Sequence, residues 1–228
     1  MKVSVVVPVY NEEAIIDKCL KAIFAQSEPA DEVILVDNNC TDNSMKIAKK
    51  YPVRIIKEKQ QGISYARNKG FDIAKYEIIT RTDSDTIVPR HWLKNIRQVM
   101  KAHPQYLAAA GPISYYDLPF NSLASWYHQN LYYYVLRAIH GYHLLHGSNM
   151  VVRKSIWQKV KNKVNMDNSQ VHEDIDLSIR IAKLGQIGYS RQLATKTSGR
   201  RSTKFVRNLE YPYRYFKMLT RLYILKNY

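Results

Sequence analysis

The sequence predicts an α/β fold in which helices flank a mostly parallel, doubly wound central sheet. In the first half of the chain, short apolar stretches rich in valine and isoleucine alternate with segments of helical periodicity. Such strand–helix alternation is typical of parallel sheets, whose strands are joined by helical crossovers. The strand stretches are also nearly continuous in apolar residues, as expected when both faces of a strand are buried.

The elements can be placed in order along the chain. Val3 to Val9 is the first predicted strand, and the next helix is expected to start at Asn11 as its N-cap. Later strands are expected at 33–36, 53–56, from Ile78 towards Asp83, and at 107–110, 147–152 and 187–189, with helices at 64–74, 90–101 and 173–184. Residues 119–146 are rich in aromatic side chains, which should form core or a crevice wall. One helical face of this segment carries Leu123, Trp126, Tyr127, Asn130 and Tyr134.

Two carboxylates, Asp83 and Asp85, follow the fourth predicted strand. On an extended segment, residues two apart point to the same side, so both carboxylates should project together. Ligands of open α/β sheets bind beyond the carboxyl ends of the strands, and hard divalent cations prefer oxygen ligands. A metal site and a pair of turn aspartates are equally good interpretations of this stretch alone.

Polar residues also follow other predicted strands. Tyr10 to Glu12 follow the first and Asp37 to Asn39 the second, so all three groups should lie along one rim of the sheet. Asp37 there could accept a hydrogen bond from a ligand or close an Asx turn. Arg67, on a nearby helix, could face a phosphate or simply the solvent.

Glu173 and Asp174 begin the helix predicted at 173–184. Acidic residues are favoured at helix N-termini by the helix dipole, which explains the pair without any function. A carboxylate directed into a crevice is also what a general base requires.

Composition limits the remaining possibilities. The chain has 228 residues, of which 46% are hydrophobic, enough for a full core, and its two cysteines form neither a disulfide framework nor a metal cluster. With no signal peptide and no apolar run of 18 residues, we expect a cytoplasmic protein. The formal net charge is +16, and half of it lies in residues 196–228, which hold nine lysines and arginines and one acid. Such a tail indicates an anionic partner or a solvated basic face.

Several motifs are missing or incomplete. Neither a Gly-x-Gly-x-x-Gly nor a Gly-Lys-Ser/Thr phosphate loop is present. Asp83-Ser84-Asp85-Thr86 is similar to the Asp-x-Asp-x-Thr motif of haloacid-dehalogenase-type phosphatases, but Ile87 stands at the position of the motif's threonine, and the segment follows the fourth strand rather than the first. A nucleic-acid-binding protein would explain the charge, but not the acids at several strand ends, so we expect no nucleic-acid partner.

Five segments, in this order, resemble family 2 glycosyltransferases of GT-A fold: VSVVVPVYNEE (3–13), VDNNCTDNS (36–44), GISYARNKG (62–70), RTDSDTIVP (81–89) and HEDIDLSIR (172–180). The resemblance covers roughly residues 3–190. It implies a GT-A, Rossmann-like domain at 1–195, with a donor-binding half at 1–110, an acceptor-binding half at 111–195 and a basic aromatic extension at 196–228.

The resemblance also implies an activity: inverting, metal-dependent transfer of one sugar from a nucleotide-diphosphate sugar, most often a UDP-sugar, to a glycan or lipid-linked acceptor in cell-surface glycan synthesis. Asp174 would be the catalytic base, with Glu173 as the alternative. Asp85, with Asp83 beside it, would bind Mg²⁺ or Mn²⁺. Positions that match the family's donor contacts are Pro8, Tyr10, Glu12, Asp37, Asn39, Arg67, Asp83 and Asn149.

Gly199-Arg200-Arg201-Ser202 lies where the family often has a mobile C-terminal segment, so either Arg200 or Arg201 reaches the diphosphate or these residues form a free, basic surface loop. Further on, Arg214, Lys217 and Arg221 share one helical face among aromatic residues. Such a helix is typical of binding to a membrane surface, which would place the protein on the inner face of the cell membrane. Packing on its own domain, or on a second copy in a homodimer, is the alternative. The Gln-x-x-Arg-Trp motif of processive synthases is absent from the sequence.

Overall fold

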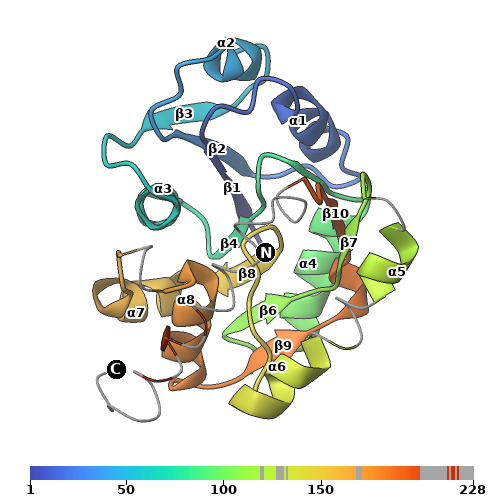
Figure 1. Ribbon diagram of the computed structural model, residues 1–228, viewed down its shortest axis with the longest axis vertical. Helices are drawn as coiled ribbons and strands as arrows, with labels where there is room; N and C mark the ends of the chain where they lie inside the picture. Colours follow the sequence, from blue (N-terminus) through green and yellow to red (C-terminus); the bar gives the residue numbers. More distant parts are fainter. Residues whose placement is uncertain are drawn as a thin grey trace.

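The computed structural model describes residues 1–118, 121–126, 131, 133–167 and 171–200, together with 215, 217, 218 and 220 (Figure 1). The strands of the main sheet are β1 (Val3–Val9), β2 (Glu32–Asp37), β3 (Arg54–Lys57), β4 (Ile78–Arg81), β6 (Ala108–Ala110), β8 (Met150–Arg153) and β9 (Ile187–Tyr189). Their order is β3-β2-β1-β4-β8-β6-β9, and in this part of the chain only β8 runs antiparallel to its neighbours. The predicted mostly parallel sheet is confirmed.

The helices are α1 (Ile16–Phe24), α2 (Ser44–Ala48), α3 (Ile63–Ile73), α4 (Trp92–Ala102), α5 (Asn121–Trp126), α6 (Tyr133–His140), α7 (Lys154–Val160), η2 (Lys161–Lys163), α8 (Glu173–Ala182) and η3 (Arg191–Leu193). Three short strands, β5 (Thr86–Ile87), β7 (Ile113–Tyr115) and β10 (Thr195–Thr197), form a second sheet in the order β5-β10-β7. This small sheet joins the loop after β4 to a segment more than a hundred residues later.

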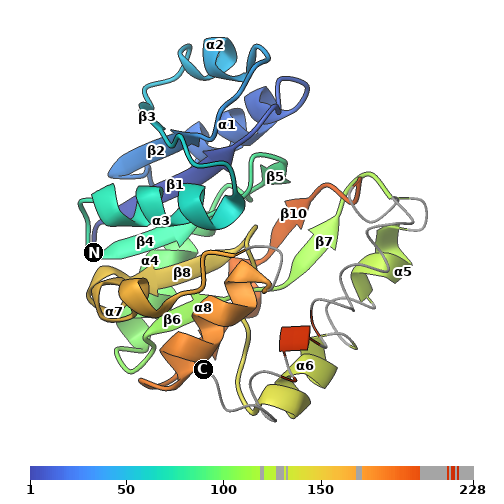
Figure 2. The same ribbon diagram turned by 60° about the vertical axis from the view of Figure 1, so that its left-hand side comes forward.

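The core lies on both faces of the main sheet. Because side chains alternate along a strand, Val5 and Val7 of β1 pack with α1 and α4, whereas Val6 packs on the other face with α3, α7 and α8. Figure 2 shows α3, α7 and α8 on the near face of the sheet and α4 behind it. Burial on both faces explains why the strands read as continuous apolar runs.

The register brings the three polar strand ends together. β1 lies between β2 and β4, with Val9 opposite Asp37 and Val6 opposite Arg81. All three strands are parallel, so residues 10–12, 37–39 and 82–85 follow the same edge of the sheet. The predicted rim is confirmed.

The first helix starts later than predicted. Asn11 has a positive φ of 51°, and its side-chain oxygen accepts a hydrogen bond from the backbone N–H of Thr41 at 2.8 Å. Helix α1 begins only at Ile16, so the prediction of Asn11 as N-cap is wrong. Residues 10–15 instead form a loop at the rim.

The aromatic segment agrees with the prediction only in part. Tyr133 is buried and lines a pocket together with the exposed Tyr134, as residues of a crevice wall do, whereas Leu123 and Trp126 are 65% and 58% exposed and are not core residues. Tyr127 and Asn130 lie outside the described residues. Among the described residues, no helix has the length and hydrophobicity required to span a bilayer.

Candidate functional site

A pocket of about 160 Å³ opens at the rim formed by the three strand ends. Its walls include Pro8 near the end of β1, Tyr10 and Glu12 after β1, and Asp83 after β4. The other lining residues are Val9, Asn38, Gln61, Gly62, Ile63, Ala66 and Ser84. Four of the residues predicted to contact a donor therefore border one pocket.

The loop after β2 is held by its own hydrogen bonds. Asp37 accepts a hydrogen bond from the backbone N–H of Cys40, three residues further along the chain, at 2.8 Å. Asn38 is buried and receives the N–H of Gly62 at 2.8 Å, while its amide donates to the Gln60 carbonyl at 2.7 Å. Asn39, with φ of 68°, donates to the Lys59 carbonyl at 2.9 Å. Asn38, rather than its two predicted neighbours, lines the pocket.

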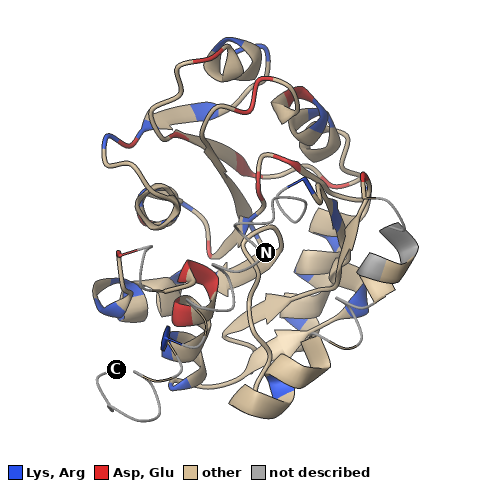
Figure 3. Cartoon of the chain, in the orientation of Figure 1, with Lys and Arg blue, Asp and Glu red and all other residues tan. Residues whose placement is uncertain are grey.

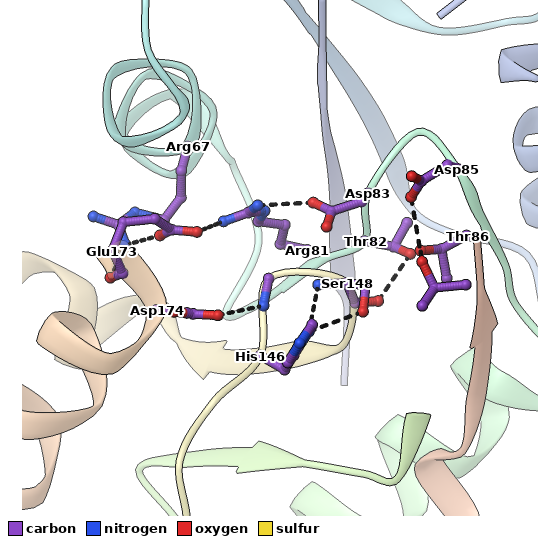
Figure 4. Close-up of polar contacts among 12 residues, drawn as sticks. Arg67, Arg81, Thr82, Asp83, Asp85, Thr86, His146, Ser148, Glu173 and Asp174 are labelled. Carbon is purple, nitrogen blue, oxygen red and sulfur yellow. Dashed lines mark hydrogen bonds and ion pairs between the residues drawn. The ribbon is translucent and has the colours of Figure 1, made fainter. Parts of the chain in front are cut away.

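Asp83 and Asp85 do not project together, contrary to the expectation from an extended strand. β4 ends at Arg81, and Ser84 and Asp85 lie in a turn closed by the N–H of Thr86 donating to the Asp83 carbonyl at 3.1 Å. Asp83 accepts a hydrogen bond from Arg81 at 2.7 Å, whereas Asp85 is turned towards β10. The two carboxylates therefore have different partners (Figure 4).

Asp85 and Glu12 converge on one guanidinium. Arg200 donates to Glu12 and, at 3.3 Å, to Asp85, and both carboxylates are buried. Thr197 donates to the other oxygen of Asp85 at 3.2 Å. Burial lowers the pKa of Arg200, but the two carboxylates outweigh this effect and raise the pKa above its ordinary value.

This arrangement fits a divalent cation that is shared with a ligand. The described residues contain no cluster of three or more His, Cys, Asp or Glu side chains that could hold a metal ion. Mg²⁺ is commonly bound by one or two carboxylates, with substrate phosphates completing its shell. Asp85 and Glu12 already surround a positive charge, which shows that this position suits a cation.

A row of buried ion pairs runs beneath the pocket. Glu173 at the start of α8 is contacted by Arg67 of α3 and by Arg81 of β4, and Arg81 also binds Asp83. Burial alone lowers the pKa of Arg81, but Glu173 and Asp83 outweigh burial and raise it. Figure 4 shows the four side chains in line.

Arg67 differs from its predicted position. Its side chain is fully buried and also donates to the backbone carbonyl of Glu173 at 2.7 Å. The guanidinium therefore faces α8 rather than the pocket. Burial lowers the pKa of Arg67, and Glu173 opposes this shift.

Asp174 is separate from that row. One of its oxygens accepts the N–H of Gly147 at 3.2 Å, and the other accepts the N–H of Ile175 at 2.9 Å. It occupies the first turn of α8, where the helix dipole favours negative charge. Figure 3 shows this acidic turn against lysines and arginines scattered over the other elements.

Gly147 fits between these groups. A Cβ added to it would lie 2.7 Å from Nη2 of Arg81. The glycine therefore lets the backbone approach Arg81 and present its N–H to Asp174. β8 begins only at Met150, so residues 147–149 form a loop rather than the predicted strand.

Asn149 has a structural position. It is fully buried, donates to the Leu193 carbonyl at 2.6 Å and accepts from the Trp92 indole at 3.3 Å. Its amide is turned into the core, which argues against the predicted donor contact. Arg201 lies outside the described residues.

Sequence reasoning missed Arg81 and Thr197. Arg81 carries a signal, because it ends an otherwise uncharged strand and lies two residues from Asp83. The sequence around Thr197 contains no such signal, because its contact with Asp85 joins residues that are 112 positions apart in the chain.

Known proteins share both the sequence pattern and the fold. The model of the family described as Glycosyl transferase family 2 matches residues 4–161. The chain is 37% identical over 102 residues to the glycosyltransferase GlyG of Streptococcus pneumoniae, covering 42% of this chain and 34% of GlyG. It is 36% identical over 100 residues to the glycosyltransferase AglE of Haloferax volcanii, covering 40% and 33%. The matched segments thus span about a third of these relatives.

Solved structures show the same fold. The mannosyltransferase PcManGT from Pyrobaculum calidifontis, in complex with GDP-Man and Mn²⁺, has a TM-score of 0.74 at 22% identity, covering 97% of this chain and 64% of that one. S. aureus TarS 1–349 in complex with UDP-GlcNAc has a TM-score of 0.68 at 19% identity, covering 87% and 58%. Because the family model matches well over half of its residues, the chain belongs to glycosyl transferase family 2.

Proposed function

We propose that the chain transfers one sugar from a nucleotide-diphosphate sugar to an acceptor hydroxyl, with inversion and with the aid of a divalent metal. The observation that carries this proposal is the meeting of Asp85 and Glu12 around a cationic group beside the strand-end pocket. A nucleoside fits in the pocket lined by Pro8 and Tyr10, and its diphosphate extends towards the two carboxylates.

The metal is Mg²⁺ or Mn²⁺, held by Asp85 and by the diphosphate, with Glu12 and Asp83 close by. When bound, it supplies Lewis-acid stabilisation of the charge on the departing nucleoside diphosphate. Two neighbours of the same fold support this choice: PcManGT is described with GDP-Man and Mn²⁺, and a Mycobacterium tuberculosis glucosyl-3-phosphoglycerate synthase with Mn²⁺ and UDP. We favour a uridine diphosphate sugar as donor.

Asp174 is the catalytic base. Its carboxylate is positioned by Gly147 and by the helix N-terminus, and neither contact neutralises it with a cation. Glu173 is a poorer candidate, because two guanidinium groups engage both of its oxygens. Asp174 therefore removes the proton from the acceptor hydroxyl, which attacks the anomeric carbon from the face opposite the nucleotide.

The acceptor is a glycan or a lipid-linked sugar in cell-surface glycan synthesis. Relatives with related printed activities are a cholesterol galactosyltransferase of Borreliella burgdorferi and a poly(ribitol-phosphate) beta-glucosyltransferase of Bacillus spizizenii. We also propose a peripheral membrane location through residues 201–228, most of which, Arg214 and Arg221 included, lie outside the described residues. Two described residues of this tail pack on the domain itself: the Tyr215 hydroxyl lies 2.9 Å from Nε2 of His140, and Met218 is buried beside Leu136 and Ile175. Flotation with liposomes tests the membrane location: equal flotation with and without residues 201–228 contradicts it.

Substitution Asp174→Asn tests the proposal. It keeps the shape of the side chain but removes the basic oxygen, so Mn²⁺-dependent binding of UDP or GDP should persist while sugar transfer falls by about a hundredfold or more. Thermal shift reports nucleotide binding, and release of nucleotide from donor sugars in the presence of acceptor extract reports transfer.

The matched control is Asp176→Asn, the same change two residues along α8. The Asp176 carboxylate faces the N–H of Asn165 and the side chain of Arg180 instead. The Asp176→Asn variant should therefore retain sugar-transfer activity. Full transfer activity in Asp174→Asn would remove Asp174 as the base, and absence of nucleotide binding in the unaltered protein would overturn the proposed function.

A further inference from the structure

The described residues line a second pocket, which is larger than the first. Its volume is about 590 Å³, against about 160 Å³ for the strand-end pocket. It lies between α6, the loop that follows it, and the end of β9; Figure 1 shows α6 and β9 together, far from α2. Its walls include Tyr133, Tyr134, Arg137, His143, Tyr189 and Arg191.

Aromatic rings form one side of this pocket. His143 stacks on Tyr189 with ring centroids 5.0 Å apart and planes 17° from parallel, and Tyr133 lies 5.1 Å from Tyr189. The Tyr133 hydroxyl donates to the Leu144 carbonyl, which fixes that ring. A rigid aromatic wall with few polar groups is typical of small-molecule sites and offers a flat, apolar surface to a sugar ring.

The charge of the pocket comes from two arginines. Arg137 and Arg191 are exposed, and neither forms an ion pair with any described residue. The only carboxylate side chain outside the described residues is Glu210. Burial, and then the charge of Arg137, lower the pKa of His143. Two exposed guanidinium groups that pair with no carboxylate among the described residues favour a phosphate, which arginine binds through two parallel hydrogen bonds.

The pocket is connected to the candidate active site through a short segment. His143 precedes Gly147 by four residues, so their Cα atoms lie within about 14 Å of each other. Gly147 in turn donates its N–H to Asp174 at 3.2 Å. A ligand held at His143 can therefore extend towards the proposed base.

We propose that this pocket binds a phosphate-bearing part of the acceptor, with the phosphate between Arg137 and Arg191 and the adjoining sugar or polyol against the Tyr189–His143 wall. This inference rests on the proposed function and extends it: the acceptor is an anionic phosphate ester and not a neutral glycan. The phosphate is bound away from the hydroxyl that reacts.

Binding of defined probes tests the inference. The full chain, saturated with UDP and Mn²⁺ so that the strand-end pocket is filled, is titrated with glucose 1-phosphate, with the phosphodiester glycerophosphoglycerol and with neutral methyl glucoside. Tighter binding of either phosphate ester than of methyl glucoside is expected, and the ester preferred distinguishes a terminal phosphate from a phosphodiester backbone. Substitutions Arg137→Met and Arg191→Met should each weaken that binding about tenfold.

Arg90→Met is the matched control, because Arg90 is an exposed arginine that lines neither pocket. It should bind every probe as the unaltered protein does. Equal affinity for methyl glucoside and the esters, or unchanged affinity in both arginine variants, would overturn the inference. Nucleotide binding in the same samples separates the two proposals. If the unaltered protein does not bind nucleotide, the proposed transferase activity is refuted. If it binds nucleotide but neither phosphate ester, only the proposed acceptor pocket is refuted.

Discussion

At the scale of single residues, Glu173 connects the two sides of the candidate site. Two buried arginines, Arg67 of α3 and Arg81 of β4, form ion pairs with its carboxylate. Arg81 also forms an ion pair with Asp83, which lines the pocket. An ion pair removed from water costs desolvation energy, which good geometry and additional hydrogen bonds can offset. The ion pairs of Glu173 therefore contribute mainly to the specificity of the fold, because they fix the position of Asp83 relative to the start of α8.

A double-mutant cycle between Arg81 and Glu173 measures this connection. Arg81→Met should destabilise the fold by about 3 kcal/mol, because Asp83 and one oxygen of Glu173 lose their buried partner. The double variant Arg81→Met/Glu173→Gln should lose less free energy of unfolding than the sum of the losses in the two single variants, with a coupling energy of about 1–3 kcal/mol. Urea unfolding followed by circular dichroism gives the three values.

The exposed pair Lys21–Asp17 on α1, at 2.7 Å, is the control. The same cycle there should show little coupling, since water screens both charges. Additive losses at Arg81 and Glu173 would mean that the guanidinium and the carboxylate do not depend on each other.

Single-residue roles were only partly predictable from the sequence. Tyr10, Glu12 and Asp83 do line the pocket, because their place at the strand ends follows from the alternation of strands and helices. Arg67 and Asn149 turn inward instead, since a partner far away in the sequence, Glu173 or Leu193, takes their donors. Sequence spacing contains no information on such distant partners.

At the scale of elements, the approach of α3 to the sheet depends on Gly70. A Cβ at this position would lie 2.3 Å from a methyl carbon of Val6 in β1 and 3.1 Å from one of Val36 in β2. The glycine interrupts the helical pattern in the sequence, and the structure supplies the reason: backbone and strand are in direct contact. The same helix carries Ile63 and Ala66 of the pocket wall.

Substitution Gly70→Ala should therefore destabilise the protein although alanine is the better helix former. Helix propensity favours alanine by about 1 kcal/mol, but overpacking against β1 costs about 1–3 kcal/mol, and more where the sheet cannot move. The midpoint of urea unfolding should fall.

Val6→Ala provides the matched test of the mechanism. In that background the extra methyl group has room, so Gly70→Ala should cost clearly less than it does in the unaltered protein. An equal cost in both backgrounds would show that the contact with Val6 is not the cause.

Element boundaries were predictable where periodicity alone decides them. β9 spans the predicted residues, and β1 does as well, because the apolar period is unbroken there. The start of α1 could not be predicted, because the side chain of Asn11 does not cap a helix. It accepts a hydrogen bond from the backbone N–H of Thr41. The turn at Asp85 was missed for a similar reason: its carboxylate is drawn to β10, a strand of the second sheet.

At the scale of the whole molecule, β10 closes the candidate site from the far end of the chain. It pairs with β5 directly after Asp85, and Arg200 then reaches Glu12, 188 residues away. The sequence predicted that Arg200 or Arg201 reaches the diphosphate, and this remains a prediction. In the structure the guanidinium of Arg200 lies between Glu12 and Asp85, the carboxylates proposed to meet the metal, and balances their charge.

Arg200 and a divalent cation should therefore compete for the same carboxylates. Substitution Arg200→Met removes one positive charge next to Asp85, so affinity for Mn²⁺ in the absence of nucleotide should rise by about three- to tenfold. Titration of Mn²⁺ followed by its electron paramagnetic resonance signal measures free and bound ion directly.

Arg90→Met, which removes a charge of the same kind outside the site, should leave the affinity unchanged. Adding Asp85→Asn to the Arg200→Met protein should abolish the gain, because a neutral amide replaces the carboxylate that the ion would use. Unchanged Mn²⁺ affinity in Arg200→Met would show that the guanidinium and the metal occupy different positions, and Arg200 would then be a structural clamp between β10 and the loop after β1.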